Sequence, residues 1–294
     1  MLLKNDSTGD YVYQGINFEV LGHVRSKTLK KTLTFIDDEN YILELEKKKN
    51  IVGILCSHKI SSKINHMSAS IIVIENPRIE FFKLQNEIGR YYKSNQTIIS
   101  KNSFIGKNAR IDNSDVIIEK NVKIGNNVII HSGSIIKEGA IIGDNSVIGN
   151  EGFEFKRDKN GHILKINHYG NVIIEENVEI KEMCSIHKAL FQWDSTVVGN
   201  NTKIDANTHV GHGSKIGKEN LIGAGANIAG NISMGDYCYV GPGAIISNRC
   251  EIGNSSRISI GSVVTKDVKD NSTVSGNFAI PHQLFIENLK KSLL

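Results

Sequence analysis

His212 is the residue whose setting best suits acid–base chemistry. Glycines flank it in Gly211-His212-Gly213 and leave its side chain accessible. Histidine titrates near neutral pH, so it can take a proton from an attacking amine. Gly230 follows His212 by 18 residues and Asp194 precedes it by 18. If residues 18 apart stack in space, a glycine N–H can stabilise an oxyanion beside the imidazole, and the carboxylate either orients the ring or points into solvent.

The spacing of 18 comes from a six-residue repeat. From Ile174 to Val264 an apolar residue occupies every sixth position, with Gln192 as the one exception, and an earlier series runs from Ile118 to Ile148. Neither an α-helix nor an alternating strand has a period of six. The repeat predicts a parallel β-helix in which three hexads form one triangular coil, with about eight coils in all.

Three of the four cysteines fall at one position of this repeat. Cys184, Cys238 and Cys250 each stand two residues before the apolar residue, where small side chains recur, and no Cys-x-x-Cys motif occurs. This position predicts that they fill the core rather than bind a metal or form disulfides. We therefore do not expect Cys238 or Cys250 to act as a nucleophile.

Composition excludes several classes of protein. The chain has 35 Lys and Arg residues against 31 Asp and Glu residues, so we expect no nucleic-acid partner. No stretch approaches the roughly 18 to 20 apolar residues that span a bilayer, and the N-terminus lacks the apolar segment of a signal peptide. The sequence therefore predicts a cytoplasmic protein without membrane insertion.

The register of six divides the chain into three parts. Residues 1–95 lack it and show strand-like runs at 33–36, 51–56 and 70–75, with helices at 40–49 and from Pro77 to about residue 92. This pattern predicts a small α/β domain. Residues 96–280 form the β-helix and 281–294 a short helix, whose Leu284, Phe285 and Leu289 are expected to cover the open end of the β-helix.

The repeat is expected to break once, at residues 151–171. This stretch is polar and aromatic, so it should leave the coil as a loop, and loops on a rigid scaffold often carry function. Phe191 and Trp193 flank Gln192 and are expected to be exposed, lining either a subunit interface or a substrate groove. The two alternatives remain open.

Three stretches in order resemble the hexapeptide-repeat acyltransferases, and among them the UDP-3-O-acylglucosamine N-acyltransferases. They are residues 35–41, 152–170 and 204–212, the last ending in the histidine that corresponds to the family's catalytic one, His212. The resemblance implies a mostly β protein, a left-handed parallel β-helix that forms a homotrimer. It also points to Gly230 as the oxyanion donor.

The resemblance extends to substrate-binding residues. In the family the first stretch holds the uracil of a sugar nucleotide, which implies that Phe35 and Tyr41 stack on the base while Asp38 accepts from its ring N–H. Ordinary core packing is the alternative for the two aromatic rings. In the second stretch the resemblance implies substrate contacts for Phe153, Phe155 and His168.

Departures from the family pattern leave the donor and the sugar open. His187-Lys188-Ala189 replaces the usual Asp-Arg-Gly, and Asp38 replaces an Asn. The tail is shorter than the extension that in the family engages acyl carrier protein, and residues 261–277 look like the closing coil of acetyl-CoA-dependent sugar acetyltransferases. His187 either binds substrate or forms a surface stack with Asp205, which lies 18 residues later.

These features together predict an N-acyltransferase that moves an acyl group from acyl-CoA or acyl carrier protein to the amine of a UDP-linked amino sugar, for surface polysaccharide or lipopolysaccharide synthesis. No cofactor is expected to be permanently bound. His187, His209 and His212 lack the spacing of a zinc site, so no metal is expected. The alternatives are the lipid A enzyme proper, which uses a hydroxyacyl carrier protein, and a non-catalytic β-helix scaffold.

Overall fold

The structure is a computed structural model that describes residues 2–5, 9–276 and 278–292. The chain forms two compact units. The first contains residues 1–95 together with 151–171 and 189–195, and the second contains the remaining residues, 96–150, 172–188 and 196–294. The loop at 151–171 therefore groups with the N-terminal residues, and so does a segment that the sequence places in the repeat.

The first unit contains a four-stranded parallel sheet of order β4-β5-β6-β7 and a three-stranded antiparallel sheet of order β1-β2-β3. A separate hairpin, β17–β18, lies within residues 151–171. The elements of this unit are β1 (Leu2–Lys4), β2 (Tyr11–Tyr13), β3 (Ile16–Phe18), β4 (Val20–Leu21), β5 (Thr32–Ile36), η1 (Glu39–Tyr41), α1 (Ile42–Glu46), β6 (Ile51–Cys56), α2 (His58–Ile64), β7 (Ser70–Val73), α3 (Pro77–Ile88), η2 (Gly89–Tyr91), β17 (Phe155–Arg157) and β18 (Ile163–Lys165).

Alternation along β5 divides the first unit into two hydrophobic clusters. Leu33 packs with Phe81 of α3 in one cluster, whereas Ile36 packs with Leu45 of α1 in the other. Side chains of a strand point alternately to its two faces, so each face of the sheet is covered separately. The strands and helices expected at residues 33–92 are present with shifted ends, but the sequence reading did not identify α2 at all.

Phe191 and Trp193 belong to the core of the first unit, not to an exposed surface. Phe191 is 4% exposed and clusters with Phe81, and its ring stacks on Trp193 with centroids 5.8 Å apart. The Trp193 indole N–H donates to the Leu21 carbonyl at 2.8 Å. The expectation of exposed aromatics was wrong because this hexad leaves the repeat.

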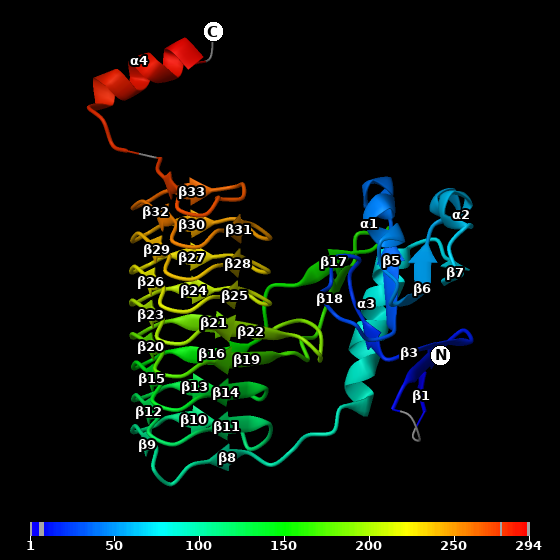
Figure 1. Ribbon diagram of the computed structural model, residues 1–294, viewed down its shortest axis with the longest axis horizontal. Helices are drawn as coiled ribbons and strands as arrows, with labels where there is room; N and C mark the ends of the chain where they lie inside the picture. Colours follow the sequence, from blue (N-terminus) through cyan, green and yellow to red (C-terminus); the bar gives the residue numbers. More distant parts are fainter. Residues whose placement is uncertain (1, 6–8, 277, 293–294) are drawn as a thin grey trace. The chain divides into compact units, whose positions relative to one another are not determined.

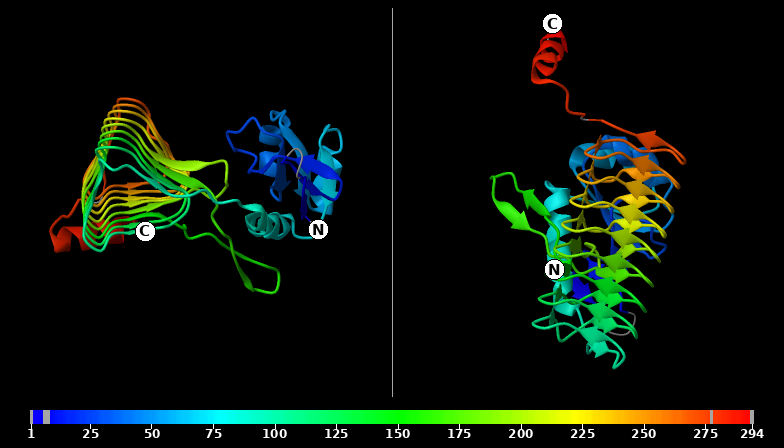
Figure 2. Two further views of the ribbon diagram at one scale, coloured as in Figure 1. Left: turned by 90° about the horizontal axis from the view of Figure 1, so that it is seen from below. Right: turned by 90° about the vertical axis from the view of Figure 1, so that its left-hand side faces the viewer.

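The second unit is a left-handed parallel β-helix of triangular cross-section (Figure 2, left). Its three sheets have eight, nine and eight strands, which confirms the expected number of coils. The first sheet contains β8 (Ile98–Ile99), β11 (Val116–Ile118), β14 (Ser134–Ile136), β19 (Asn171–Ile174), β22 (Ser195–Val198), β25 (Lys215–Ile216), β28 (Ser233–Met234) and β31 (Glu251–Ile252).

The other two sheets follow the same order along the stack (Figure 1). The second sheet contains β9 (Phe104–Ile105), β12 (Lys123–Ile124), β15 (Ile141–Ile142), β20 (Glu179–Ile180), β23 (Lys203–Ile204), β26 (Leu221–Ile222), β29 (Tyr239–Val240), β32 (Arg257–Ile258) and β34 (Thr273–Val274). The third sheet contains β10 (Arg110–Ile111), β13 (Ile129–Ile130), β16 (Val147–Asn150), β21 (Ser185–His187), β24 (His209–Val210), β27 (Asn227–Ile228), β30 (Ile245–Ile246) and β33 (Val263–Val264).

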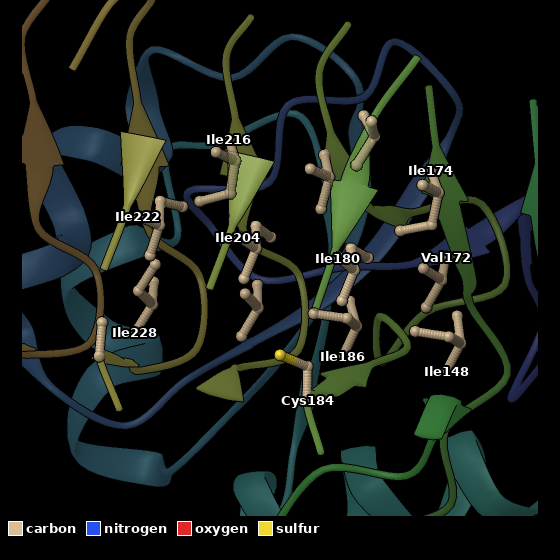
Figure 3. Packing of buried hydrophobic residues seen from close by; sticks show 14 of the residues in the cluster. Ile148, Val172, Ile174, Ile180, Cys184, Ile186, Ile204, Ile216, Ile222 and Ile228 are labelled. Atoms are coloured by element: carbon tan, nitrogen blue, oxygen red, sulfur yellow. The ribbon is translucent and has the colours of Figure 1, made fainter. Parts of the chain in front are cut away.

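The repeating apolar residues stack inside the prism as a continuous core (Figure 3). Ile186, Val210 and Ile228 are fully buried on successive coils, and Cys184, Cys238 and Cys250 are buried beside such residues as expected. Each fully buried Ile or Val contributes roughly 1.5–3 kcal/mol. The stack therefore holds every corner of the prism in a fixed position.

The register shows a second interruption that the sequence reading missed. Ile180 pairs with Ile204 and Ile186 with Val210, so this step is 24 residues instead of 18. The surplus is six residues, and residues 189–195, which include Gln192 and end at the first residue of β22, group with the first unit instead of with the coils. Gln192 interrupts the apolar series because it does not face the core.

A C-terminal helix forms as expected, but it does not cover the end of the β-helix core. In α4 (His282–Ser292) none of the described residues is buried. Leu284, Phe285 and Leu289 are 45%, 51% and 43% exposed. Among the described residues, no helix, α4 included, has both the length and the apolar character needed to cross a bilayer.

Candidate active site

All four histidines of the β-helix coils lie at one edge of the prism. His131 and His187 directly follow the buried residues of β13 and β21, His209 is in β24, and His212 lies at the corner after β24. These three strands belong to the third sheet. We call the edge formed by the corners after third-sheet strands the histidine edge. Both expelled segments, residues 151–171 and 189–195, also leave the coil here.

The His212 imidazole packs directly over Gly230, as the stacking rule predicts. A Cβ on Gly230 would lie 2.8 Å from His212 Nε2, and the Asn231 N–H donates to the His212 carbonyl at 2.8 Å. Only a glycine leaves room for the ring at this distance. Gly211 is required for a similar reason, because a Cβ there would lie 2.5 Å from the Gly230 nitrogen.

The Gly230 N–H is available to a ligand. At the equivalent corner position on the other edges, the Lys107 and Lys218 N–H groups donate to Asn126 Oδ1 (2.9 Å) and Asp236 Oδ1 (2.9 Å) in the next coil. Within the described part of the chain, no group accepts a hydrogen bond from the Gly230 N–H. An unused donor beside an imidazole is the arrangement that an oxyanion site needs.

A row of imidazoles continues from His212 toward the N-terminal coils. The rings of His187 and His209 meet edge to face, with centroids 4.6 Å apart. Burial lowers the pKa of His209, and the nearby charge of His212 lowers it further. His209 therefore favours its neutral form.

His187 does not stack with Asp205. Ile186 pairs with Val210 and Ile180 with Ile204, so residues 24 apart lie opposite each other at this point. The residue 18 positions after His187 therefore falls on a neighbouring sheet. His187 remains on the histidine edge, whereas Asp205 follows a strand of the second sheet. The alternative of a structural surface stack is thus wrong.

Asp194 belongs to the expelled segment 189–195 of the first unit. Its Oδ1 accepts from the Ser195 N–H at 2.8 Å, directly before β22. β22 and β25 keep the 18-residue register, with Val197 opposite Lys215. Orientation of the His212 ring by Asp194 stays a prediction.

The three residues predicted to hold uracil occupy separate positions in the first unit. Phe35 packs in the cluster of α3, with the Arg78 guanidinium 5.8 Å above its ring centroid. Tyr41 packs in the other cluster, under the Arg25 guanidinium at 5.2 Å. Asp38 Oδ1 accepts from the Asn40 N–H at 2.9 Å as the cap of η1. The structure does not bring the Phe35 and Tyr41 rings together.

The second set of predicted substrate residues lies at the β17–β18 hairpin. Phe153 is 87% exposed and meets Phe155 with ring centroids 4.9 Å apart. His168 is 3% exposed, and its backbone N–H donates to Glu151 Oε1 at 3.3 Å. Burial would raise the pKa of Glu151, but Lys165 and this N–H lower it overall.

Two candidate residues escaped the sequence reading. His131 Nδ1 lies 3.3 Å from Asp112 Oδ2, and Lys188 Nζ donates to the Ser132 carbonyl at 3.0 Å, both at the histidine edge. His131 follows its buried isoleucine as His187 does, and this shared hexad position was the available signal. In the described ranges no group of three His, Cys, Asp or Glu side chains is arranged to hold a metal ion.

Comparison with known proteins agrees with the repeat. Residues 115–150 and 195–230 match the family model described as bacterial transferase hexapeptide (six repeats). UDP-3-O-acylglucosamine N-acyltransferase 2 of Sulfurimonas denitrificans is 30% identical over 130 residues, 44% of this chain and 40% of that protein. The Campylobacter lari UDP-3-O-acylglucosamine N-acyltransferase is 36% identical over 86 residues, 29% of this chain and 26% of that protein.

The matches thus span less than half of these relatives' length. A crystal structure of a UDP-N-acetylglucosamine acyltransferase has 25% sequence identity and a TM-score of 0.51, and the match covers 68% of this chain and 80% of that one. The chain therefore carries the hexapeptide repeat of bacterial transferases and, over part of its length, resembles the UDP-3-O-acylglucosamine N-acyltransferases.

Proposed function

We propose that this protein is an N-acyltransferase that moves an acyl group from an acyl thioester to the amine of a UDP-linked amino sugar. The observation that supports this most is the packing of His212 over Gly230, whose N–H is free for a ligand in the described structure. One contact thus combines a general base with an oxyanion donor. Surface polysaccharide or lipopolysaccharide synthesis is the process that uses such products.

The reaction follows from these two groups. The amine nitrogen attacks the thioester carbonyl carbon while His212 takes a proton from the amine, and the carbonyl oxygen becomes an oxyanion at the Gly230 N–H. The C–S bond then breaks, and the protonated imidazole returns its proton to the leaving thiolate. A general base typically contributes 10²–10⁴-fold and an oxyanion donor a further 10²–10³-fold, so the pair accounts for a large part of the rate.

The cysteines are poor alternatives as nucleophiles. Burial raises the pKa of Cys184 to about 11, and burial also raises the pKa values of Cys238 and Cys250. Because only a thiolate attacks a thioester efficiently, these side chains stay inert at neutral pH. Direct attack of the amine needs no acyl-enzyme once both substrates are held in position.

The proposal includes further properties that the resemblance implies. The protein is a cytoplasmic homotrimer with no permanently bound cofactor, its active sites lie between neighbouring β-helices, and its N-terminal unit holds the nucleotide. Acyl-CoA or acyl carrier protein supplies the acyl group. Sedimentation equilibrium tests the assembly, and a monomer at micromolar concentration contradicts it.

The experiment on His212 tests the chemistry. We expect His212→Gln to lower kcat by about 10²–10⁴-fold with purified enzyme and a UDP-amino sugar, because the general base is lost. His282→Gln, in α4, serves as the control and should leave turnover unchanged. Unchanged turnover in His212→Gln removes the base assignment, and no turnover of any UDP-amino sugar by the wild type favours a non-catalytic scaffold.

A second candidate is the lipid A enzyme itself, because the curated relatives described above bear that name. It uses a long hydroxyacyl chain on acyl carrier protein, whereas the closing coil at residues 261–277 looks like that of acetyl-CoA-dependent enzymes. Short acyl-CoA and hydroxyacyl carrier protein should be compared as donors on the same preparation. Strict dependence on the carrier protein identifies the lipid A reaction.

A further inference from the structure

Exposed lysines gather at one end of the parallel sheet in the first unit. β5 and β6 pair from their first residues, and the stretches that precede them are residues 22–31 and 47–50. These stretches lie side by side, since the Lys48 ammonium donates to the Ser26 carbonyl at 3.1 Å. The exposed lysines there are Lys27, Lys30, Lys31, Lys47 and Lys49. We call this surface the lysine end of the sheet.

The carboxylates of this region do not neutralise the lysine end. Residues 19–31 and 44–50 contain seven Lys and Arg residues against three Glu residues and no Asp. Each glutamate already has a partner. The contacts are those of Glu44 with the Arg25 guanidinium (2.7 Å), Glu46 with His66 Nε2 (3.0 Å) and Glu19 with the Lys31 backbone N–H (2.8 Å). None of the five exposed lysines forms an ion pair with another described residue.

The opposite end of the sheet carries charges of both signs. Asp37 pairs with Arg78 at 2.7 Å and Glu39 pairs with Lys59 at 3.1 Å, and both carboxylates follow the carboxyl end of β5. Residues 35–41, which the resemblance assigns to the nucleotide, lie at this end too. β5 is five residues long, so about 16 Å separate the two ends. The lysine end therefore stays open to another partner while a nucleotide is bound.

An apolar side chain stands among these lysines. Leu29 is 97% exposed and lies between Lys27 and Lys30 in the loop before β5. The Asn50 amide holds this loop, since its Nδ2 donates to the Thr28 and Lys30 carbonyls, both at 3.1 Å. The main chain on each side of Leu29 is thus anchored, and the leucine side chain projects into solvent from a fixed position.

A leucine surrounded by lysines is complementary to an anionic lipid surface. Each lysine near such a surface raises the affinity about fivefold, and an apolar side chain gains by entering the headgroup region. RNA would satisfy the lysines, but its bases stack on flat aromatic or guanidinium groups and offer no apolar layer to Leu29. The same surface of a second copy carries the same charge and is repelled by it. The lipid surface is therefore the partner that uses both the charge and the leucine.

We propose that the lysine end docks on the negatively charged surface of a phospholipid membrane, with Leu29 entering the headgroup region. The contact is peripheral. It is independent of the proposed acyl transfer, because it uses none of the residues assigned to that reaction. The attraction is mainly electrostatic, so salt should weaken the binding as the screening length falls from about 10 Å at 0.1 M to about 3 Å at 1 M.

Two triple variants of the full-length protein test the inference. The first removes three charges from the lysine end, by Lys27→Gln, Lys30→Gln and Lys31→Gln. The matched control removes three exposed charges from the second unit, by Lys101→Gln, Lys107→Gln and Lys123→Gln. Cosedimentation at low salt with vesicles rich in phosphatidylglycerol measures the affinity. We expect the first variant to lose about a hundredfold in affinity and the control to match the wild type, whereas vesicles of phosphatidylcholine alone should bind neither.

Leu29→Ser separates a membrane from other polyanions. It should weaken vesicle binding about tenfold, because the apolar contact is lost, while circular dichroism shows an unchanged fold. Unchanged vesicle binding in Leu29→Ser, equal losses in the two triple variants, equal binding to both kinds of vesicle, or tighter binding to a single-stranded RNA each overturns the inference. All of these variants should turn over a UDP-amino sugar like the wild type. Vesicle binding by a wild type that acylates no UDP-amino sugar keeps the inference and overturns only the proposed reaction.

Discussion

The contact between His212 and Gly230 places two demands on a single position. The ring needs the space that a missing Cβ leaves, since that atom would lie 2.8 Å from Nε2. The reaction also needs the N–H of the same residue. Glycine meets both demands, so the packing and the proposed chemistry both require a glycine at position 230.

Gly230→Ala should reduce kcat by about 10²-fold or more while the fold persists, because the methyl group displaces the imidazole from its place beside the oxyanion donor. Alanine is compatible with this corner position, since Ala206 and Ala224 occupy it on another edge. The measurement is steady-state kinetics together with circular dichroism. An active Gly230→Ala enzyme contradicts the site.

His209 should make stability depend on pH. Its pKa is lowered in the folded protein, chiefly by burial, so the unfolded chain binds more protons below the unfolded value near 6.5. The stability that it contributes is complete above that value and is lost as pH falls through the folded pKa. Urea unfolding between pH 5 and 8 should show a flatter profile for His209→Asn than for the wild type, and parallel profiles disprove the effect.

At the scale of elements, the hexad is the unit that packs. Ile186 is fully buried between its neighbours in the third sheet, whereas Ile245 points outward from the same sheet and is 45% exposed. The inward residue contacts the coils above and below, so a void there cannot easily collapse.

Ile186→Ala should lower the free energy of unfolding by about 2–5 kcal/mol, because it loses buried contacts and leaves a cavity. The matched variant Ile245→Ala should cost about 0.5 kcal/mol or less. Denaturant titration of both proteins, monitored by far-ultraviolet circular dichroism, measures the difference. Equal costs would mean that the stack is not the source of stability.

The register also shows where the sequence could and could not predict the structure. The period of six gave the β-helix, its number of coils and the pairing of His212 with Gly230, because strand spacing follows directly from the repeat. It did not show that residues 189–195 leave the coil, since six surplus residues keep the period intact. Gln192 was the only local sign of that departure.

Other parts of the site depend on contacts between distant segments. The separation of Phe35 and Tyr41 follows from which face of β5 each residue packs on, and the burial of Phe191 depends on Phe81, over 100 residues away. No local pattern contains this information. The predicted helix at the C-terminus formed, but its partner surface was not the end of the β-helix core.

At the scale of the whole molecule, the first unit is discontinuous in sequence. Its core includes Ile166, Leu190 and Phe191, and the buried Gln85 amide donates to the Leu190 carbonyl at 2.9 Å. Residues 1–95 alone lack these partners. The first unit therefore depends on residues 151–171 and 189–195, which lie between strands of the β-helix in the sequence.

A fragment of residues 1–95 should fail to show a cooperative thermal transition, because part of its core is missing. In the full chain, Phe191→Ala should lower the stability of the first unit by about 3–5 kcal/mol and leave β-helix unfolding unchanged. Calorimetry of the three proteins gives the comparison. Cooperative unfolding of the fragment at the temperature of the full-length first unit would refute this dependence.

The expelled hexad has a consequence for how such a chain tolerates change in length. Loss of six residues from within 189–195 would turn a step of 24 into one of 18 and leave every later rung in phase. The same loss between His212 and Gly230 would rotate all downstream rungs by a third of a turn and carry Gly230 away from the imidazole. A change in length at 189–195 thus preserves the register of the coils, although the first unit loses core residues there, whereas the same change in the coil that follows destroys the register.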